Sequence, residues 1–235
     1  MGKDKLRKFA EMATFPNVIQ PQLQEVLNSD YFLKGKWNSE IFKNSNPIVL
    51  ELGCGKGEYS VGLAKRYPEK NFIGVDIKGA RMWRGASTAL NEKLQNVYFL
   101  RTRIEHITSF FAPSEISEIW ITFPDPQEKR IRAKKRLTSS RFLPKYQQFL
   151  KPGGIIHLKT DNVLLYNYSY QLCVHNNLNI IKSTANLYET ETDINLLSIQ
   201  THYESLFRAE GISIKYLSFS LNGSKNIEEP PDDLG

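Results

Sequence analysis

From residue 47 onward, short apolar runs alternate with segments of helical periodicity. The runs are rich in Ile, Val, Leu and Phe, which is typical of buried strands. Strands are predicted at residues 48–52, 71–76, 97–100, 116–123, 155–160 and 180–184. Residues 212–221 alternate apolar and polar positions, which predicts a last strand at an edge of the sheet.

Segments with apolar residues at helical spacing separate these runs. Helices are predicted at residues 59–66, 79–93, 104–111, 137–150 and 163–174. Strands that alternate with helices favour an α/β fold with a doubly wound, mostly parallel seven-stranded sheet. Without an internal repeat or linker, residues 47–222 are interpreted as one domain. Residues 1–46 are a predicted N-terminal extension, and the acidic, Pro-rich residues 223–235 a predicted disordered tail.

The first predicted strand runs into a loop with glycine at every second position: Gly53, Gly55 and Gly57. Glycine permits sharp turns and close approach of a ligand, and the helix that follows points its amide-rich start at the same place. Dinucleotide dehydrogenases use Gly-x-Gly-x-x-Gly, which differs from the spacing here. Glu51 would repel a pyrophosphate but suits an ammonium or sulfonium group, so the pattern favours S-adenosylmethionine. Asp76, at the end of the second strand, suits ribose hydroxyls.

Two further carboxylates follow predicted strands. Asp125 stands in Phe-Pro-Asp-Pro after the fourth strand, and Asp161 follows the fifth. In a parallel sheet, ligands bind beyond the carboxyl ends of the strands, so both are candidates for a site. For Asp125, a role in forming a turn is an equally good explanation. For Asp161, a role as helix N-cap is an equally good explanation. On spacing alone, residues 201–204 are better explained as a capping box than as a binding segment.

Composition narrows the class of protein. Hydrophobic residues make up 40% of the 235, and no apolar run is long enough to span a bilayer. The charged N-terminus lacks the apolar core of a signal peptide, so a cytoplasmic location is expected. Cys54 and Cys173 are interpreted as free thiols without metal-ligand spacing, and no metal is expected. The four His form no legible catalytic triad and receive no catalytic role.

The net charge of +6 is concentrated in residues 129–136, where six of eight residues are Lys or Arg. Like charges at this density repel one another, and an anionic partner offsets the repulsion. Because the run begins four residues after Asp125, it would place phosphate anchors at the rim of the predicted site. An RNA substrate fits that placement, although a solvated helix face is the simpler alternative.

Four stretches together resemble the bacterial tRNA (guanine-N7)-methyltransferase family, in the family's order. They are Leu-Glu-Leu-Gly-Cys-Gly-Lys-Gly at 50–57, Phe-Pro-Asp-Pro at 123–126 with Lys129 and the basic run, Leu-Lys-Thr-Asp at 158–161, and Thr-His-Tyr-Glu at 201–204. The glycine loop is shared by many methyltransferases, whereas the second and fourth stretches are more specific. The resemblance implies a Rossmann-like class I methyltransferase fold and methylation of the guanine at tRNA position 46.

The resemblance also implies roles for individual residues. Asp125 would be the catalytic residue. S-adenosylmethionine would be bound by Glu51, Gly53, Gly55, Asp76, Arg103 and Asp125. The tRNA substrate would be bound by Lys129, Asp161, Thr201, His202, Tyr203 and Glu204. The chain departs from the family at Gln127, Arg132 and Arg103, where Trp, His and Asp are usual.

Other functions are compatible with parts of this pattern. An S-adenosylmethionine enzyme with another substrate would share the glycine loop, and a catalytically silent RNA-binding protein would share the basic run. A nicotinamide dehydrogenase is disfavoured by Glu51 and by the glycine spacing. The oligomeric state, monomer or homodimer, is left open by the sequence.

Overall fold

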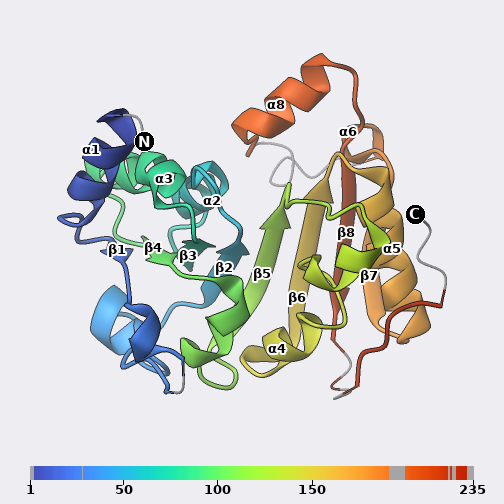
Figure 1. Ribbon diagram of the computed structural model, residues 1–235, viewed down its shortest axis with the longest axis horizontal. Helices are drawn as coiled ribbons and strands as arrows, with labels where there is room; N and C mark the ends of the chain where they lie inside the picture. Colours follow the sequence, from blue (N-terminus) through green and yellow to red (C-terminus); the bar gives the residue numbers. More distant parts are fainter. Residues whose placement is uncertain (1–2, 28, 191–198, 222, 224–225, 232–235) are drawn as a thin grey trace. The chain divides into compact units, whose positions relative to one another are not determined.

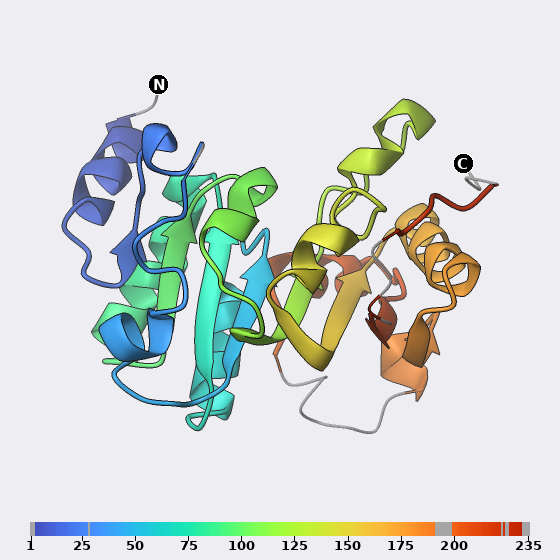
Figure 2. The same cartoon turned by 90° about the horizontal axis from the view of Figure 1, so that it is seen from below.

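The computed structural model describes residues 3–27, 29–190, 199–221, 223 and 226–231. The chain divides into two compact units, Met1–Ile116 and Ser117–Gly235, and Figures 1 and 2 colour it along the sequence from blue to red. Eight strands occur among the described residues, one more than predicted. The helices and strands within each unit decide which candidate residues are brought together there.

The first unit is built on four parallel strands. Their order is β1 (Val18–Ile19), β4 (Val97–Arg101), β3 (Asn71–Asp76) and β2 (Ile48–Leu52). All five residues of β2 are buried, as expected for a parallel strand covered on both faces. Strands β2 and β3 have the predicted bounds, and β4 is one residue longer. The unpredicted strand is β1.

The helical segments of the first unit are α1 (Lys3–Met12), η1 (Leu23–Glu25), η2 (Trp37–Phe42), α2 (Glu58–Arg66), α3 (Gly79–Asn91) and η3 (Ile104–Ser109). The N-terminal extension therefore contributes helices and a strand to this unit. Trp37 is fully buried, its indole N–H donates to the carbonyl of Phe110 (2.9 Å), and its ring stacks on Phe111. The extension thus forms part of the core of the first unit.

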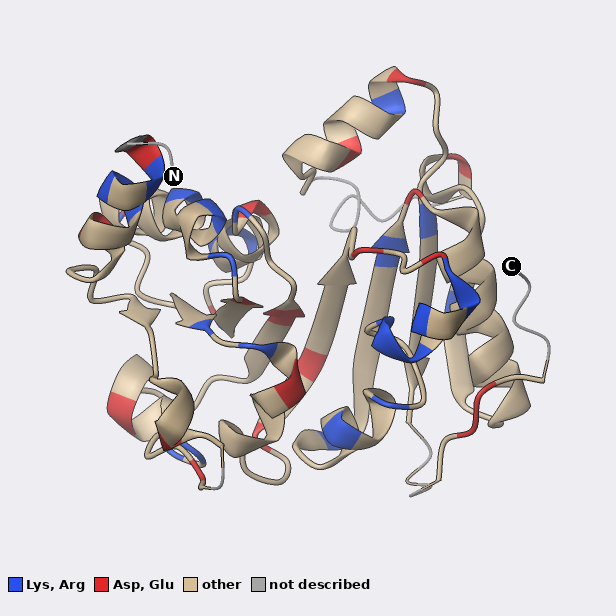
Figure 3. Cartoon of the chain, viewed as in Figure 1, with Lys and Arg blue, Asp and Glu red and all other residues tan. Residues whose placement is uncertain are grey.

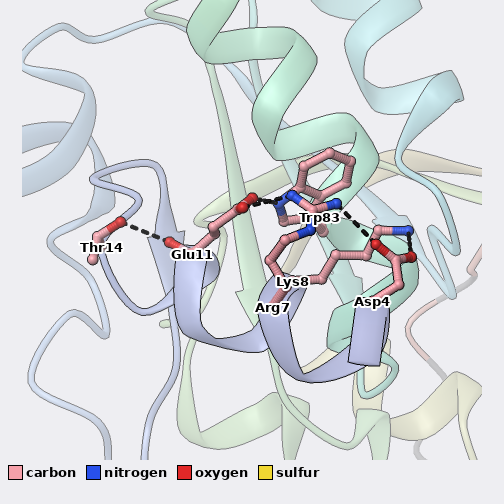
Figure 4. Close-up of polar contacts among 6 residues, drawn as sticks. All are labelled: Asp4, Arg7, Lys8, Glu11, Thr14 and Trp83. Atoms are coloured by element: carbon pink, nitrogen blue, oxygen red, sulfur yellow. Dashed lines mark hydrogen bonds and ion pairs between the residues drawn. The ribbon is translucent and has the colours of Figure 1, made fainter. Parts of the chain in front are cut away.

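Helix α1 packs against α3 around Trp83 (Figure 4). The indole N–H of Trp83 donates to Glu11 (2.7 Å), and Arg7 and Lys8 lie over the ring at 5.4 and 5.1 Å. Arg7 also pairs with Asp4 and Glu11 on its own helix. The basic residues of α1 are therefore partly neutralised within the helix.

The second unit has the strand order β5 (Ile116–Thr122), β6 (Leu150–Thr160), β8 (Lys215–Ser220) and β7 (Asn179–Thr184). Strand β8 pairs antiparallel with both β6 and β7. The predicted edge position of residues 212–221 is therefore wrong, because β7 ends the order and β8 is interior. All six residues of β8 are buried, including the polar ones that gave the sequence its alternation.

The helical segments of this unit are η4 (Arg130–Lys135), α4 (Leu143–Gln147), α5 (Val163–His175), α6 (Leu187–Thr190) and α8 (His202–Ala209). The helix predicted over 137–150 is reduced to the five residues of α4. The predicted helix stop, residues 151–154, instead lies inside β6, where Gly153 takes a positive φ of 73°. The glycines thus shape the start of a strand rather than the end of a helix.

Part of the predicted disordered tail is bound to the second unit. Ile227 is buried, and Glu229 accepts hydrogen bonds from the Ser140 N–H (3.1 Å) and the Tyr168 hydroxyl (2.7 Å). Asn176, after α5, exchanges two hydrogen bonds with the backbone of Glu228. The expected disorder is therefore wrong for residues 226–231, while 224–225 and 232–235 lie outside the described residues.

Candidate functional site

The glycine loop connects β2 to α2 in the first unit. Gly53, Gly55 and Gly57 have positive φ angles of 77°, 54° and 71°, a region that L side chains rarely adopt. A Cβ at Gly55 would meet only the carbonyl oxygen of Gly53, at 3.9 Å. The backbone at Gly55 is therefore open to a close ligand.

The third glycine has a packing role that spacing alone did not reveal. A Cβ at Gly57 would lie 2.5 Å from the ring of Phe99 and 3.2 Å from the Cα of Gly85. A Cβ at Gly85, on α3, would lie 2.8 Å from the Cα of Gly57 and from the carbonyl oxygen of Lys56. Helix α3 and β4 thus pack directly against the glycine loop.

Asp76 holds the loop to the end of β3. Its Oδ2 accepts the Gly55 N–H (2.9 Å), and its Oδ1 accepts the Lys78 N–H (2.7 Å). Each carboxylate oxygen has two lone pairs, so each can accept a further hydrogen bond. The half-buried Asp76 can therefore brace the loop and also bind hydroxyl groups.

Glu51 is buried beneath the loop, 3% exposed. Its Oε2 accepts hydrogen bonds from the N–H (2.9 Å) and the hydroxyl of Ser60, in the first turn of α2. A carboxylate at a helix start also interacts favourably with the helix dipole. Burial, with the charges of Glu51 and Asp76, raises the pKa of Cys54, so that side chain stays a neutral thiol.

Arg103, the remaining candidate in the first unit, is exposed and directly precedes η3. The neighbouring Arg101 is instead bound within the unit, donating to the side chain of Gln20 (3.2 Å). The first unit thus brings Glu51, the glycine loop and Asp76 together, and the role of Arg103 stays a prediction.

Asp125 lies in a strained turn after β5 in the second unit. Its Oδ1 accepts the Gln127 N–H (3.1 Å), and the carboxylate is exposed. Phe123 and Gln127 have positive φ angles of 47° and 48° without being glycine. Such strain persists where the surrounding structure enforces it, often at functional sites. The turn interpretation is confirmed, and it leaves the carboxylate accessible.

Arg136, the last residue of the basic run, is buried, whereas the other basic residues of the run are exposed. Arg136 is fully buried, donates to the carbonyls of Pro126, Gln127 and Glu128 at 3.2–3.4 Å, and lies 4.2 Å from the ring centre of Tyr168. Its prediction as part of a phosphate-binding surface needs correction, because its charge supports the Asp125 turn from inside. The exposed members are Lys129, Arg130, Arg132, Lys134 and Lys135. They follow one another along the segment between β5 and α4 (Figure 3).

Asp161 follows β6 and is half-buried. The N-cap of α5 is its neighbour Asn162, whose side chain accepts the Leu165 N–H (2.8 Å), so the N-cap alternative for Asp161 is wrong. The ammonium of Lys215 donates to the backbone carbonyl of Asp161 (2.8 Å). Burial raises the pKa of the Asp161 carboxyl, partly opposed by the nearby charge of Lys215.

Thr201 is the N-cap of α8, and its hydroxyl accepts the Glu204 N–H (3.1 Å). This confirms the Thr201 half of the predicted capping box, whereas the Glu204 side chain makes other contacts. Glu204 is fully buried and pairs through Oε1 with Lys159 (2.7 Å) and the hydroxyl of Tyr188 (2.9 Å). Its Oε2 is buried without a hydrogen-bond partner among the described residues. His202 and Tyr203 are exposed at the start of α8.

The sequence interpretation missed Lys159, Tyr188 and Gly85. A signal was present for Lys159, because a single Lys in a buried apolar strand requires a charged partner. No such signal marks Tyr188, whose contact with Glu204 joins two helices separated by residues outside the described part of the chain.

His157 is held by structural contacts. Its ring stacks on Trp120 with 4.0 Å between centroids, and its nitrogens lie 2.7 Å from the Tyr216 hydroxyl and 3.2 Å from Glu118. Within the described parts of the chain, no group of three or more His, Cys, Asp and Glu residues could hold a metal ion. Nor does any helix of those parts have the length and apolar character to cross a membrane.

Comparisons with known proteins agree on one chemistry. A family described as "Putative methyltransferase" matches residues 45–217. The tRNA (guanine-N(7)-)-methyltransferase of Bacteroides fragilis is 50% identical, with 100% of this chain and 92% of the relative covered. Those of Porphyromonas gingivalis (52%; 95% and 91% covered) and Cytophaga hutchinsonii (39%; 93% and 98% covered) carry the same name.

Solved structures with low identity share the fold. The 16S rRNA methyltransferase KamB matches with a TM-score of 0.60 and 13% identity, covering 77% of this chain and 91% of its own. The 16S rRNA (adenine(1408)-N(1))-methyltransferase of Catenulisporales acidiphilia matches with 0.56 and 12%, covering 81% and 92%. With the strands and helices above, these matches confirm the predicted Rossmann-like α/β class.

The packing of α3 against the glycine loop makes a stability prediction. Ala normally favours a helix over Gly by about 1 kcal/mol. At Gly85 the added methyl would instead meet the loop backbone, and we expect Gly85→Ala to lower the free energy of unfolding by about 1–3 kcal/mol. Urea denaturation measures the change. Arg81→Ala, at an exposed position of α3, is the control and should stay within about 0.5 kcal/mol. Equal or greater stability of Gly85→Ala would contradict the tight packing.

Proposed function

This chain belongs to the tRNA (guanine-N(7)-)-methyltransferase family, and from that premise we propose that it methylates N7 of the guanine at position 46 of tRNA. Its methyl donor is S-adenosylmethionine. The observation that carries the proposal is the identity of about one half to relatives of that name over nearly their whole length. The cytoplasm, where tRNA is modified, is the proposed location.

The residues of the first unit fit this donor. When bound, S-adenosylmethionine supplies an electrophilic methyl group on a positively charged sulfur. The open backbone at Gly55 admits a close ligand, Gly53 begins the same loop, and Asp76 has lone pairs left for ribose hydroxyls. The buried carboxylate of Glu51 favours a cation nearby. The exposed Arg103, after β4, is proposed as a further donor contact.

The chemistry of the target explains why a negative charge is needed and a general base is not. Guanine N7 has a lone pair and no proton, so its attack requires no general base. Methylation leaves positive charge on the purine, and a fixed carboxylate beside the ring stabilises that charge as it develops. We assign this role to Asp125, which is also proposed as a donor contact, because its turn is held by hydrogen bonds while its carboxylate is exposed.

The other residues of the second unit suit recognition of the base and its backbone. N1 and N2 of guanine are donors, and the half-buried Asp161 carries acceptor oxygens. Oε2 of the buried Glu204 is a further acceptor, without a hydrogen-bond partner among the described residues. Thr201, His202 and Tyr203 lie at the start of the same helix as Glu204 and are proposed to border the base. Lys129 is exposed and is proposed to contact a phosphate.

A direct assay tests the function. The protein is incubated with bulk tRNA and S-adenosylmethionine labelled in the methyl group, and the tRNA is digested to nucleosides. We expect the label in 7-methylguanosine, and mapping by mass should place it at position 46. Label in another nucleoside would assign a different substrate. Absence of transfer together with absence of donor binding by calorimetry would favour a silent RNA-binding protein.

The role of Asp125 predicts a specific kinetic defect. Asp125→Asn removes the charge but keeps an oxygen for the Gln127 N–H, so the turn should be retained. We expect turnover at saturating substrates to fall by about a hundredfold, the scale found when one electrostatic stabiliser is lost. Single-turnover kinetics measures the step. Glu210→Gln, at an exposed position after α8, is the control, and near-normal turnover of Asp125→Asn would exclude the role.

The burial of Arg136 and the exposure of the other basic residues predict which charges of the run bind RNA. Lys134→Ala with Lys135→Ala should weaken tRNA binding and reduce the slope of log K against log salt by up to about 0.7–0.9 per lost phosphate contact. Arg136 is left intact because it supports the Asp125 turn. Lys145→Ala with Lys151→Ala removes the same charge elsewhere in the second unit and is the control. Equal slopes for the two double variants would identify the run as ordinary surface.

A further inference from the structure

Lys159 is connected to two of the segments proposed to bind the substrate. It lies near the carboxyl end of β6, two residues before Asp161, and its side chain is fully buried. Its backbone carbonyl accepts the N–H of Phe123 (2.8 Å), at the start of the Asp125 turn. Its ammonium lies 2.7 Å from Glu204, on α8. One residue of β6 thus touches both the Asp125 turn and α8.

Further contacts hold α8 in the same place. Tyr188 of α6 donates to Glu204, and the guanidinium of Arg208 lies 3.7 Å from the centre of the Tyr188 ring. The ring of Phe207 lies 5.9 Å from that of Phe123. Helix α8 is therefore held by one ion pair, one hydrogen bond and two ring contacts, and its N-cap Thr201 directly precedes the turn that contains Glu204.

Stability alone is a weak reason for such an ion pair. Both side chains are completely buried, and the cost of removing two charges from water can exceed their attraction. Burial lowers the pKa of Lys159, whereas the neighbouring Glu204 opposes that shift. Apolar residues of similar volume often replace a buried pair without loss of stability, so stability alone does not account for the pair.

We propose that Lys159 is a positioning residue for the RNA substrate: by holding Glu204 it fixes the start of α8 in register with the Asp125 turn. The proposal rests on the function proposed above. Without the ammonium, Glu204 would leave its place to reach water or become protonated, and Thr201, His202 and Tyr203 would lose their alignment. Apart from Asp125, the proposed donor-binding residues belong to the first unit. The contact of Lys159 with the Asp125 turn is made by its backbone carbonyl, which every side-chain variant keeps, so donor binding should not depend on the ion pair.

The test separates substrate alignment from general stability. For Lys159→Met we expect kcat/KM for tRNA to fall by about a hundredfold, the effect of an ångström-scale misplacement. The calorimetric Kd for S-adenosylmethionine should be unchanged. Lys159→Arg keeps the charge and should recover most of kcat/KM. Leu158→Ala removes a buried side chain of the same strand and is the stability control; well below its Tm it should keep its kcat/KM.

A second variant covers the case in which Lys159→Met does not fold. Lys159→Met with Glu204→Leu replaces the pair by apolar groups and should fold, yet its kcat/KM for tRNA should stay low. Wild-type kcat/KM in either Met variant, or an equal loss in Leu158→Ala, would overturn the positioning role.

The same series distinguishes failure of this inference from failure of the proposed function. If the wild-type protein methylates no tRNA, the proposed function is wrong. The positioning role is then tested by measuring the Kd for tRNA of the same variants. A wild-type Kd in Lys159→Met would then overturn the role, and so would absence of tRNA binding by the wild-type protein. If the wild-type protein is active and Lys159→Met is equally active, only the positioning role falls.

Discussion

A carboxylate that is removed from water must find its hydrogen-bond donors within the chain, and this constraint shapes the candidate residues of each unit. Glu51 is satisfied by the first turn of α2, and Asp76 by the glycine loop and the backbone of Lys78. Glu204 pairs with the ammonium of Lys159 and accepts a hydrogen bond from the hydroxyl of Tyr188. Each carboxylate thereby fixes the segment that supplies its donors, so charge and local geometry are determined together.

Asp125 shows the opposite solution. Its carboxylate is exposed, and the turn that carries it is held by other groups, chiefly the buried guanidinium of Arg136. Asp125 accepts one hydrogen bond from its own turn and keeps most of its acceptor capacity for a ligand, because Arg136 supplies the other hydrogen bonds that order the backbone. The basic run thus supplies both a buried support and an exposed surface, in adjacent residues of one sequence motif.

Much of the fold could be predicted because it depends on local pattern. The buried parallel strands β2 and β3 are continuous apolar runs, and their bounds were predicted correctly. Prediction failed where tertiary contacts decide. Strand β8 alternates like an edge strand but is interior, and residues 226–231 have a disordered composition yet bind α5 through Glu229 and Asn176.

The candidate site divides in the same way. Spacing selected Glu51, the glycines and Asp76 as candidates, and the structure brings them together because loop, strand and helix are contiguous in sequence. It could not identify Gly85 or Lys159, whose partners are far away along the chain: Gly57 for the first and Glu204 for the second. A glycine in a helix and a lysine in an apolar strand both contradict the local preference of their element. Such local violations are compensated at long range, and they are expected where a fold must hold a functional segment in one position.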